Sequence, residues 1–150
     1  MELCIGLEEA LMSGVKRTVG SVMVKSPITV EPWQPVAHAR QLMLMHSFSY
    51  LPLWLTDQWW LLSELGLAKF LNASQNKKHI RLGLTIEQAI HHQPKLQLLP
   101  VPNIKLLTHE RPTEELLQLA ADGEGPTLWL VIEDGRINHL AGVLSPFELM

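Results

Sequence analysis

The stretch that decides the fold lies near the C-terminus and reads Asp134-Gly135-Arg136, then Leu140-Ala141-Gly142-Val143-Leu144, then Ser145-Pro146-Phe147-Glu148-Leu149. An Asp-Gly pair between apolar runs is a strong hairpin signal, so a strand at 130–133 is predicted to turn and return at 138–144. Ser145, Pro146 and Glu148 stand at the N-cap, N1 and N3 positions of a capping box. The stretch therefore predicts a hairpin followed directly by a helix.

The same order of elements occurs earlier in the chain. Pro35 and Pro112 each open an apolar-periodic run, which predicts helices at 35–45 and 112–121. The apolar blocks that follow, 51–55 and 128–132, keep the same spacing as the two prolines and are typical of buried strands. In the first copy a turn at Asp57-Gln58 leads to a second block that ends at Ser63. With opening strands at 28–30 and 105–107, each copy is predicted to run strand, helix, strand, turn, strand and short helix.

Three further segments complete the predicted organisation. A helix at 2–13 precedes the copies, a polar linker covers 72–83, and a short helix with a capping box covers 85–92. The division that follows is an N-terminal helix at 1–18, a first repeat at 19–71, a linker at 72–84 and a second repeat at 85–150. The predicted fold class is α/β or α+β.

Composition excludes several classes of protein. The chain has 150 residues, of which 47% are hydrophobic and 18% charged, so it is not disordered. A net charge of −3 gives no basic field for nucleic acid or an anionic membrane. The longest uncharged stretch, 41–56, is shorter than the roughly 18 apolar residues of a membrane helix. Cys4 is the single cysteine, which excludes a disulfide framework, and we expect a cytoplasmic protein without a signal peptide.

Three groups of residues resemble the family of tandem cystathionine β-synthase-type (CBS) domains, or Bateman modules. Val19–Met23 with Ser26–Val30 is similar to the opening of that family, and Pro35–Met43 is similar to its first helix. Asp134–Leu149 resembles its closing motif. The resemblance implies two repeats, each a three-stranded sheet with two helices, packed sheet to sheet. It also implies clefts that take adenosine-containing ligands, a homodimer, and regulation of an attached or partner protein, without catalysis.

The candidate ligand site is the closing motif of the second repeat, with Gly142, Ser145 and Glu148. A carboxylate can accept hydrogen bonds from both hydroxyls of a ribose, and a serine at a helix N-terminus can approach a phosphate. The same residues also suit a plain capping box, and the sequence does not separate these two interpretations. In the first repeat the matching acidic position is Gly66, so we expect no nucleotide in the cleft that this repeat closes.

Other polar residues give weaker signals. Lys105 and His109 beside the second repeat are candidates for phosphate contact, as is the basic cluster in the linker formed by Lys77, Lys78, His79 and Arg81. The histidine spacings suit no metal site, and no catalytic motif or cofactor motif is present. The expected function is therefore binding of AMP, ADP, ATP or S-adenosylmethionine by a regulatory module. The alternative is a degenerate pair that serves as a ligand-free dimerisation or partner-docking scaffold.

Overall fold

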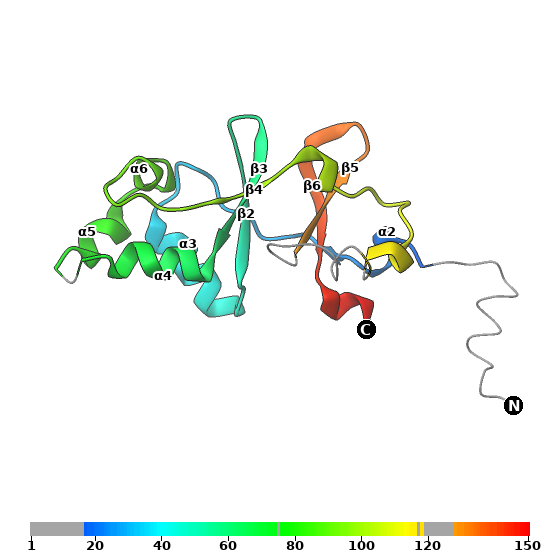
Figure 1. Ribbon diagram of the computed structural model, residues 1–150, viewed down its shortest axis with the longest axis horizontal. Helices are drawn as coiled ribbons and strands as arrows, with labels where there is room; N and C mark the ends of the chain where they lie inside the picture. The colour runs from blue at the N-terminus through cyan, green and yellow to red at the C-terminus, as the bar shows by residue number, and fades with distance from the viewer. Residues whose placement is uncertain (1–16, 75, 117, 119–127) are drawn as a thin grey trace, which may run out of the picture. The chain divides into compact units, whose positions relative to one another are not determined.

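The structure is a computed structural model that describes residues 17–74, 76–116, 118 and 128–150. The predicted helix at 2–13 and most of the predicted helix at 112–121 lie outside the described residues. The elements follow the chain in the order α2 (Val19–Val22), β1 (Val24–Lys25), α3 (Val36–His46), β2 (Tyr50–Leu55), β3 (Gln58–Ser63), α4 (Glu64–Asn72), α5 (Lys78–Gly83), α6 (Ile86–Ile90), β4 (Leu99–Val101), η1 (Asn103–Lys105), η2 (Thr113–Glu115), β5 (Trp129–Glu133), β6 (Arg136–Leu144) and η3 (Pro146–Leu149) (Figure 1).

The chain forms two compact units, each with one three-stranded antiparallel sheet. Unit 2 is the continuous segment Ile28–Lys105, with the strand order β2-β3-β4. Unit 1 joins the described parts of Met1–Pro27 and Leu106–Met150, with the order β1-β6-β5. The mixed α/β class with two three-stranded sheets is confirmed. The units do not coincide with the repeats read at 19–71 and 85–150.

Short-range turn chemistry explains the hairpin of unit 2. Thr56 and Asp57 both have positive φ, 55° and 57°, as a two-residue type I′ turn requires. Leu55 pairs with Gln58 across this turn. The predicted turn at Asp57-Gln58 was therefore wrong by one residue, because Gln58 already belongs to the ladder.

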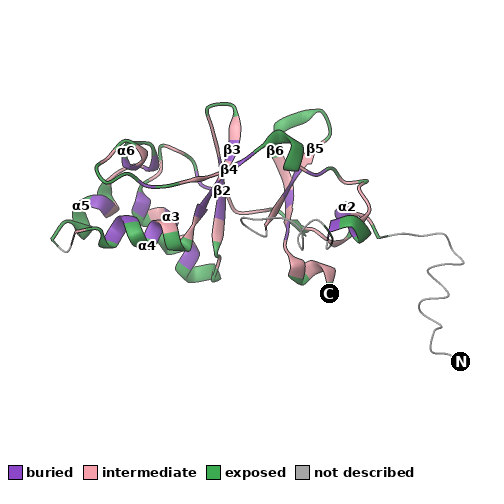
Figure 2. Ribbon diagram, in the orientation of Figure 1, coloured by how far each residue is buried: buried purple, intermediate pink, exposed green. Residues whose placement is uncertain are grey.

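The core of unit 2 lies between its sheet and its helices, which gather at one side of the sheet in Figure 1. On α3 the buried residues are Val36, Ala39 and Met43, at helical spacing, while His46 is exposed. Helix α3 begins after Pro35, which is the N-cap and not the first helical residue. Figure 2 shows the same alternation, with buried and exposed positions side by side along α3 and α4.

The segment predicted as a solvated linker is largely helical and partly buried. Helix α4 runs to Asn72, and α5 packs against α3 and α4. Arg81 of α5 is only 2% exposed, and its Nη1 donates to the Phe70 carbonyl oxygen at 3.1 Å. Its guanidinium carbon lies 5.6 Å from the centre of the Phe70 ring. Arg81 therefore fastens the end of α4 and is not a solvent-exposed member of a basic cluster.

Unit 1 has the predicted hairpin, with Asp134 and Gly135 in the turn and Gly135 at φ 73°. A register shift between Val131 and Ile132 marks an irregularity in the ladder. A small core of Val19, Leu107, Leu116, Val131 and Leu144 covers the sheet.

The predicted opening strands at 28–30 and 105–107 do not form. Val30 is buried and makes one backbone bond to Pro52, and Leu107 makes only an isolated bridge to Val131. The third strand of each sheet comes instead from β4 and β1.

The segment that opens each repeat belongs to the unit that holds the body of the other repeat. Thr85, the N-cap of α6, forms a bridge with Pro35, the N-cap of α3, within unit 2. Thr18, the N-cap of α2, forms the matching bridge with Pro112 within unit 1. Each unit is therefore built from the opening of one repeat and the body of the other.

Candidate functional site

The corner where β6 runs into η3 holds two of the predicted site residues. The Glu148 Oε1 atom accepts from the Ser145 backbone N–H at 2.6 Å and from the Ser145 hydroxyl at 2.9 Å. The Ser145 hydroxyl in turn accepts from the Phe147 N–H at 3.3 Å. The capping box read from the sequence is therefore present, and it stabilises the start of η3.

The capping box leaves part of the Glu148 carboxylate available. Its second oxygen, Oε2, has no hydrogen-bond partner among the described residues, and the side chain is half-buried. Arg17 lies beside it and donates from Nη2 to the Glu148 carbonyl oxygen at 3.2 Å. This exposed cation was missed by sequence reasoning, because 131 positions separate the two residues. The corner thus combines a carboxylate oxygen that can accept a hydrogen bond with a cation that can bind an anionic group.

Gly142 has a packing role in the middle of β6. A Cβ at this position would lie 2.6 Å from the Met23 sulfur and 2.8 Å from the Val24 carbonyl oxygen. Because one of these atoms belongs to the backbone, it cannot move aside as a side chain would. The glycine therefore allows β1 to approach β6, and Lys25 pairs directly with Gly142.

A cavity of about 530 Å³ opens within unit 1 beside this strand pair. It is lined by Gly20, Met23, Lys25, Ser26, Pro27, His109, Glu133, Leu140 and Ala141. His109 is positioned by its carbonyl oxygen, which accepts from the Gly20 N–H at 2.9 Å, and a Cβ at Gly20 would come within 3.1 Å of its ring. The lining thus brings apolar surface together with one amine, one imidazole and one carboxylate.

Acidic groups surround the same end of the hairpin. Glu133 forms an exposed ion pair with Arg136 at 3.6 Å. A hydrogen bond with Glu110 raises the pKa of Asp134, whereas a backbone hydrogen bond lowers the pKa of Glu110. This acidic rim favours ligands that also carry hydrogen-bond donors.

The predicted site residues are only partly brought together. His109 lines the cavity, and Gly142 adjoins it through Ala141 and Met23. Ser145, which directly follows β6, is four residues beyond Ala141, about 13 Å at the rise of a strand. A single ribose cannot contact both places. Lys105 is an exposed residue of η1 in unit 2, separate from the unit that holds the other four.

The matching corner of the first repeat differs in chemistry. Ser63 caps α4 by accepting from the Gly66 N–H at 2.9 Å. A Cβ at Gly66 would lie 3.0 Å from the Ser63 hydroxyl and 3.2 Å from the Gln97 carbonyl oxygen. The position that could carry an acid is therefore occupied by a glycine in a crowded place.

The described part of the chain was also compared with the requirements of a metal site and of a membrane-spanning helix. Within it, no group of three His, Cys, Asp or Glu side chains is arranged to hold a metal ion. None of its helices has both the length and the apolar character needed to cross a lipid bilayer.

Comparisons with known proteins show the fold. No protein-family model matches the sequence, and no curated protein matches it. Among solved structures, the chain is similar to a CBS domain-containing protein of unknown function from Bacillus anthracis, with 14% identity and a TM-score of 0.64. That match covers 92% of this chain and 94% of the other.

Two further structures contain ligands. One is CBSX2 in complex with AMP, with 18% identity, a TM-score of 0.58, and coverage of 89% of this chain and 93% of the other. The second is the CBS domain pair of protein MJ0100 in complex with 5′-methylthioadenosine and S-adenosyl-L-methionine. It has 17% identity, a TM-score of 0.58, and coverage of 90% and 94%. The chain thus has the fold of a tandem CBS-domain pair, a Bateman module, as its motifs indicated.

Proposed function

We propose that the chain is a non-catalytic regulatory module whose unit 1 binds an adenosine-containing ligand, such as AMP, ADP, ATP or S-adenosylmethionine. The observation that carries the proposal is the corner at Ser145 and Glu148, where the Glu148 Oε2 atom has no hydrogen-bond partner among the described residues. Adenosyl ligands in two proteins of the same fold support this choice of ligand class. In this proposal the ligand state would be relayed to a regulated partner protein.

The chemistry of the corner suits a ribose. The Glu148 Oε2 atom can accept from a ribose hydroxyl while Oε1 stays in the capping box. A charge-assisted hydrogen bond of this kind is roughly twice as strong as a neutral one. Arg17 can meet a phosphate or carboxylate of the same ligand, since its guanidinium already lies against Glu148.

Thermal unfolding with each of the four ligands tests the proposal. A ligand at 100 times its dissociation constant stabilises the fold by about 2.7 kcal/mol, which raises the melting temperature by roughly 5–10 °C for a chain of this size. Glu148→Ala is expected to abolish that rise. The same substitution costs the ligand-free protein about 1 kcal/mol or less, the usual loss for a cap.

Two control variants locate the ligand within unit 1. His109→Ala removes a cavity side chain, and Lys105→Ala removes an exposed cation of unit 2. We expect Lys105→Ala to keep the full response to ligand. If His109→Ala loses the response to ligand while Glu148→Ala retains it, the ligand binds in the cavity. That result would contradict binding at the Ser145–Glu148 corner. Absence of any response in the wild-type protein at millimolar ligand would contradict adenosyl binding altogether.

The second candidate function is a ligand-free scaffold for dimerisation or partner docking. The crowded Gly66 corner, which has no carboxylate at the position that matches Glu148, favours this alternative. The hydrogen bond between the Ser145 hydroxyl and Glu148 Oε1 also favours it, because it occupies both groups within the cap. A chain that self-associates while none of the four ligands changes its melting temperature would support the scaffold.

A further inference from the structure

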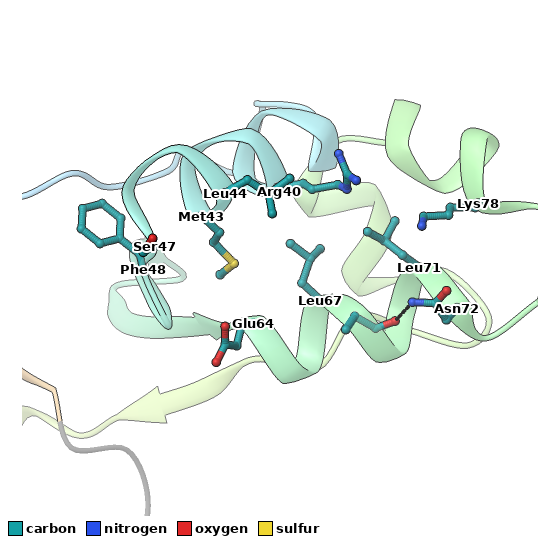
Figure 3. A pocket seen from close by; sticks show the side chains of 11 residues that line it. Arg40, Met43, Leu44, Ser47, Phe48, Glu64, Leu67, Leu71, Asn72 and Lys78 are labelled. Carbon is teal, nitrogen blue, oxygen red and sulfur yellow. Dashed lines mark hydrogen bonds between the residues drawn. The ribbon is translucent and has the colours of Figure 1, made fainter.

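A groove of about 420 Å³ lies between α3 and α4 of unit 2. Figure 3 shows Met43 of α3 and Leu67 of α4 pointing toward one another in its centre, and Leu71 continues the floor. These three side chains also belong to the core of the unit, so the floor is apolar and held in place by packing. The volume is within the range of small-molecule sites, roughly 300–1,000 Å³.

Two cations lie at one end of the groove. Arg40 of α3 and Lys78 of α5 are both exposed, and both line this end (Figure 3). Neither side chain forms an ion pair or a hydrogen bond with another described residue. Two like charges that face one space repel each other, and an anion placed between them removes that repulsion. This end is therefore suited to a carboxylate, whose two oxygens match the fork of a guanidinium.

The opposite end of the groove is aromatic and acidic. Phe48 lines it, and its ring stacks on the His46 ring with 5.1 Å between the ring centres. The Phe48 N–H also donates to the Met43 carbonyl oxygen at 3.2 Å, which fixes the backbone at this end. Glu64 is the single acidic residue among the described residues that line the groove. It repels an anionic group, so a ligand with one charged end can lie in one direction only.

The spacing along α3 sets the length of such a ligand. Arg40 and Ser47 are seven residues apart, about 10 Å at the rise of a helix. An extended chain advances about 1.2 Å per bond, so roughly eight to ten carbons span this distance. Leu44 also lines the groove and is 65% exposed, which leaves apolar surface for the chain to cover.

We propose that the α3–α4 groove of unit 2 is a binding site for a single-chain carboxylate of roughly eight to ten carbons. Its carboxylate lies between Arg40 and Lys78, and its chain lies over Met43 and Leu67 toward Phe48. The groove belongs to unit 2 alone, whereas the adenosyl site proposed above lies in unit 1. Either site can therefore fail its test without affecting the other.

Methionine methyl NMR of the full chain, titrated with decanoate below its micelle concentration, tests the site. Met43 reports on the groove, and Met23 reports on the cavity of unit 1. We expect decanoate to shift the Met43 signal and to leave the Met23 signal unchanged. Hexanoate keeps the charge but has four fewer carbons, and it should bind at least tenfold more weakly. Decyltrimethylammonium keeps the chain but reverses the charge, and it should also bind at least tenfold more weakly.

A matched pair of charge reversals tests the head-group contact. Arg40→Glu is expected to weaken decanoate binding at least tenfold. Lys95→Glu makes the same charge change at an exposed position outside the groove and should weaken it less than threefold. Circular dichroism of both variants checks that the fold is kept.

Four results would overturn the proposal. The first is an equal effect of the two charge reversals, and the second is binding of decyltrimethylammonium as tight as that of decanoate. The third is a shift of Met23 in place of Met43, which would put decanoate in the cavity of unit 1. The fourth is a Met43 signal that ignores decanoate but moves with protein concentration, which would show that a second copy of the chain covers the groove.

Discussion

Two glycines and two serines show how single residues shape the two corners. Gly142 lets β1 approach β6, and Gly66 fits between a serine hydroxyl and a carbonyl oxygen. Ser145 and Ser63 both cap the element that follows their hairpin, yet only Ser145 has a carboxylate three residues later. The serines of the two repeats therefore share a capping role. The repeats differ in whether a carboxylate three residues after that serine is available to a ligand.

Gly142→Ala tests the close approach of β1 to β6. The added Cβ would collide with the Met23 sulfur and the Val24 carbonyl oxygen, so we expect a loss of about 1–3 kcal/mol in the free energy of unfolding. Urea denaturation followed by circular dichroism measures it. Gly83→Ala is the matched control, because nothing lies within 4 Å of its added Cβ. That control should gain about 0.4–1 kcal/mol. Equal effects of the two substitutions would contradict the packing role.

At the scale of elements, α5 is the main departure from expectation. Its sequence, with Lys78, His79 and Arg81, is typical of a solvated segment, but Arg81 is directed inward onto Phe70. The guanidinium satisfies a carbonyl in the last turn of α4 and lies over an aromatic face. Its Nε atom has no partner among the described residues, which reduces the net gain from burying the charge.

Replacement of Arg81 tests whether α5 is fastened through this side chain. Arg81→Ala removes a buried hydrogen bond and the packing on Phe70, so we expect a loss of about 2 kcal/mol or more in unfolding free energy. Lys77→Ala, at an exposed position whose side chain makes no capping bond, should change it by about 0.5 kcal/mol or less. Chemical denaturation compares the two variants. A loss in Arg81→Ala no larger than in Lys77→Ala would show that the linker interpretation was right.

At the scale of the whole molecule, sequence repeats and compact units are different divisions of the chain. The third strand of each sheet and the helix preceding it come from the segment that opens the other repeat. Ile86, Ala89 and Leu96 lie outside the first repeat, yet they belong to the core that contains Leu51 and Leu62. A cut between the repeats therefore removes core residues from both units.

Fragments test this division directly. Residues 28–105 contain the whole of the unit 2 core, so we expect this fragment to fold and to melt cooperatively. Residues 19–71 lack α6 and β4 and should remain unfolded, because too little apolar surface is buried. Circular dichroism and thermal melts of the two purified fragments provide the comparison. A cooperative melt of 19–71 would show that the sequence repeat is itself the folding unit.

Local patterns predicted many of the elements. The helix after Pro35, the strands at 51–55 and 128–132 and the capping box at Ser145 all depend on neighbours within a few residues. The failures lie where the outcome depends on distant partners. Strands at 28–30 and 105–107 had suitable apolar residues, but they make only isolated backbone contacts beside β2 and β5, while β4 and β1 join the opposite edges of the two hairpins. In the candidate site, His109 lines a cavity whose other walls come from residues 20–27 and 133–141. These partners are distant in the sequence, so the neighbours of His109 along the chain did not predict the cavity.

The sequence by itself determined the two hairpins, the helix after Pro35, the capping boxes at Thr85 and Ser145, and the resemblance to a CBS pair. These follow from spacing and from side chains that act on their own turn of backbone. Only the tertiary structure decided that Arg81 is buried, that the opening segments cross between units, and that Arg17 meets Glu148. Such pairings depend on which apolar surfaces remain to be buried once each sheet has formed. The sequence around each residue carries no signal of its distant partner, so these contacts could not be predicted locally.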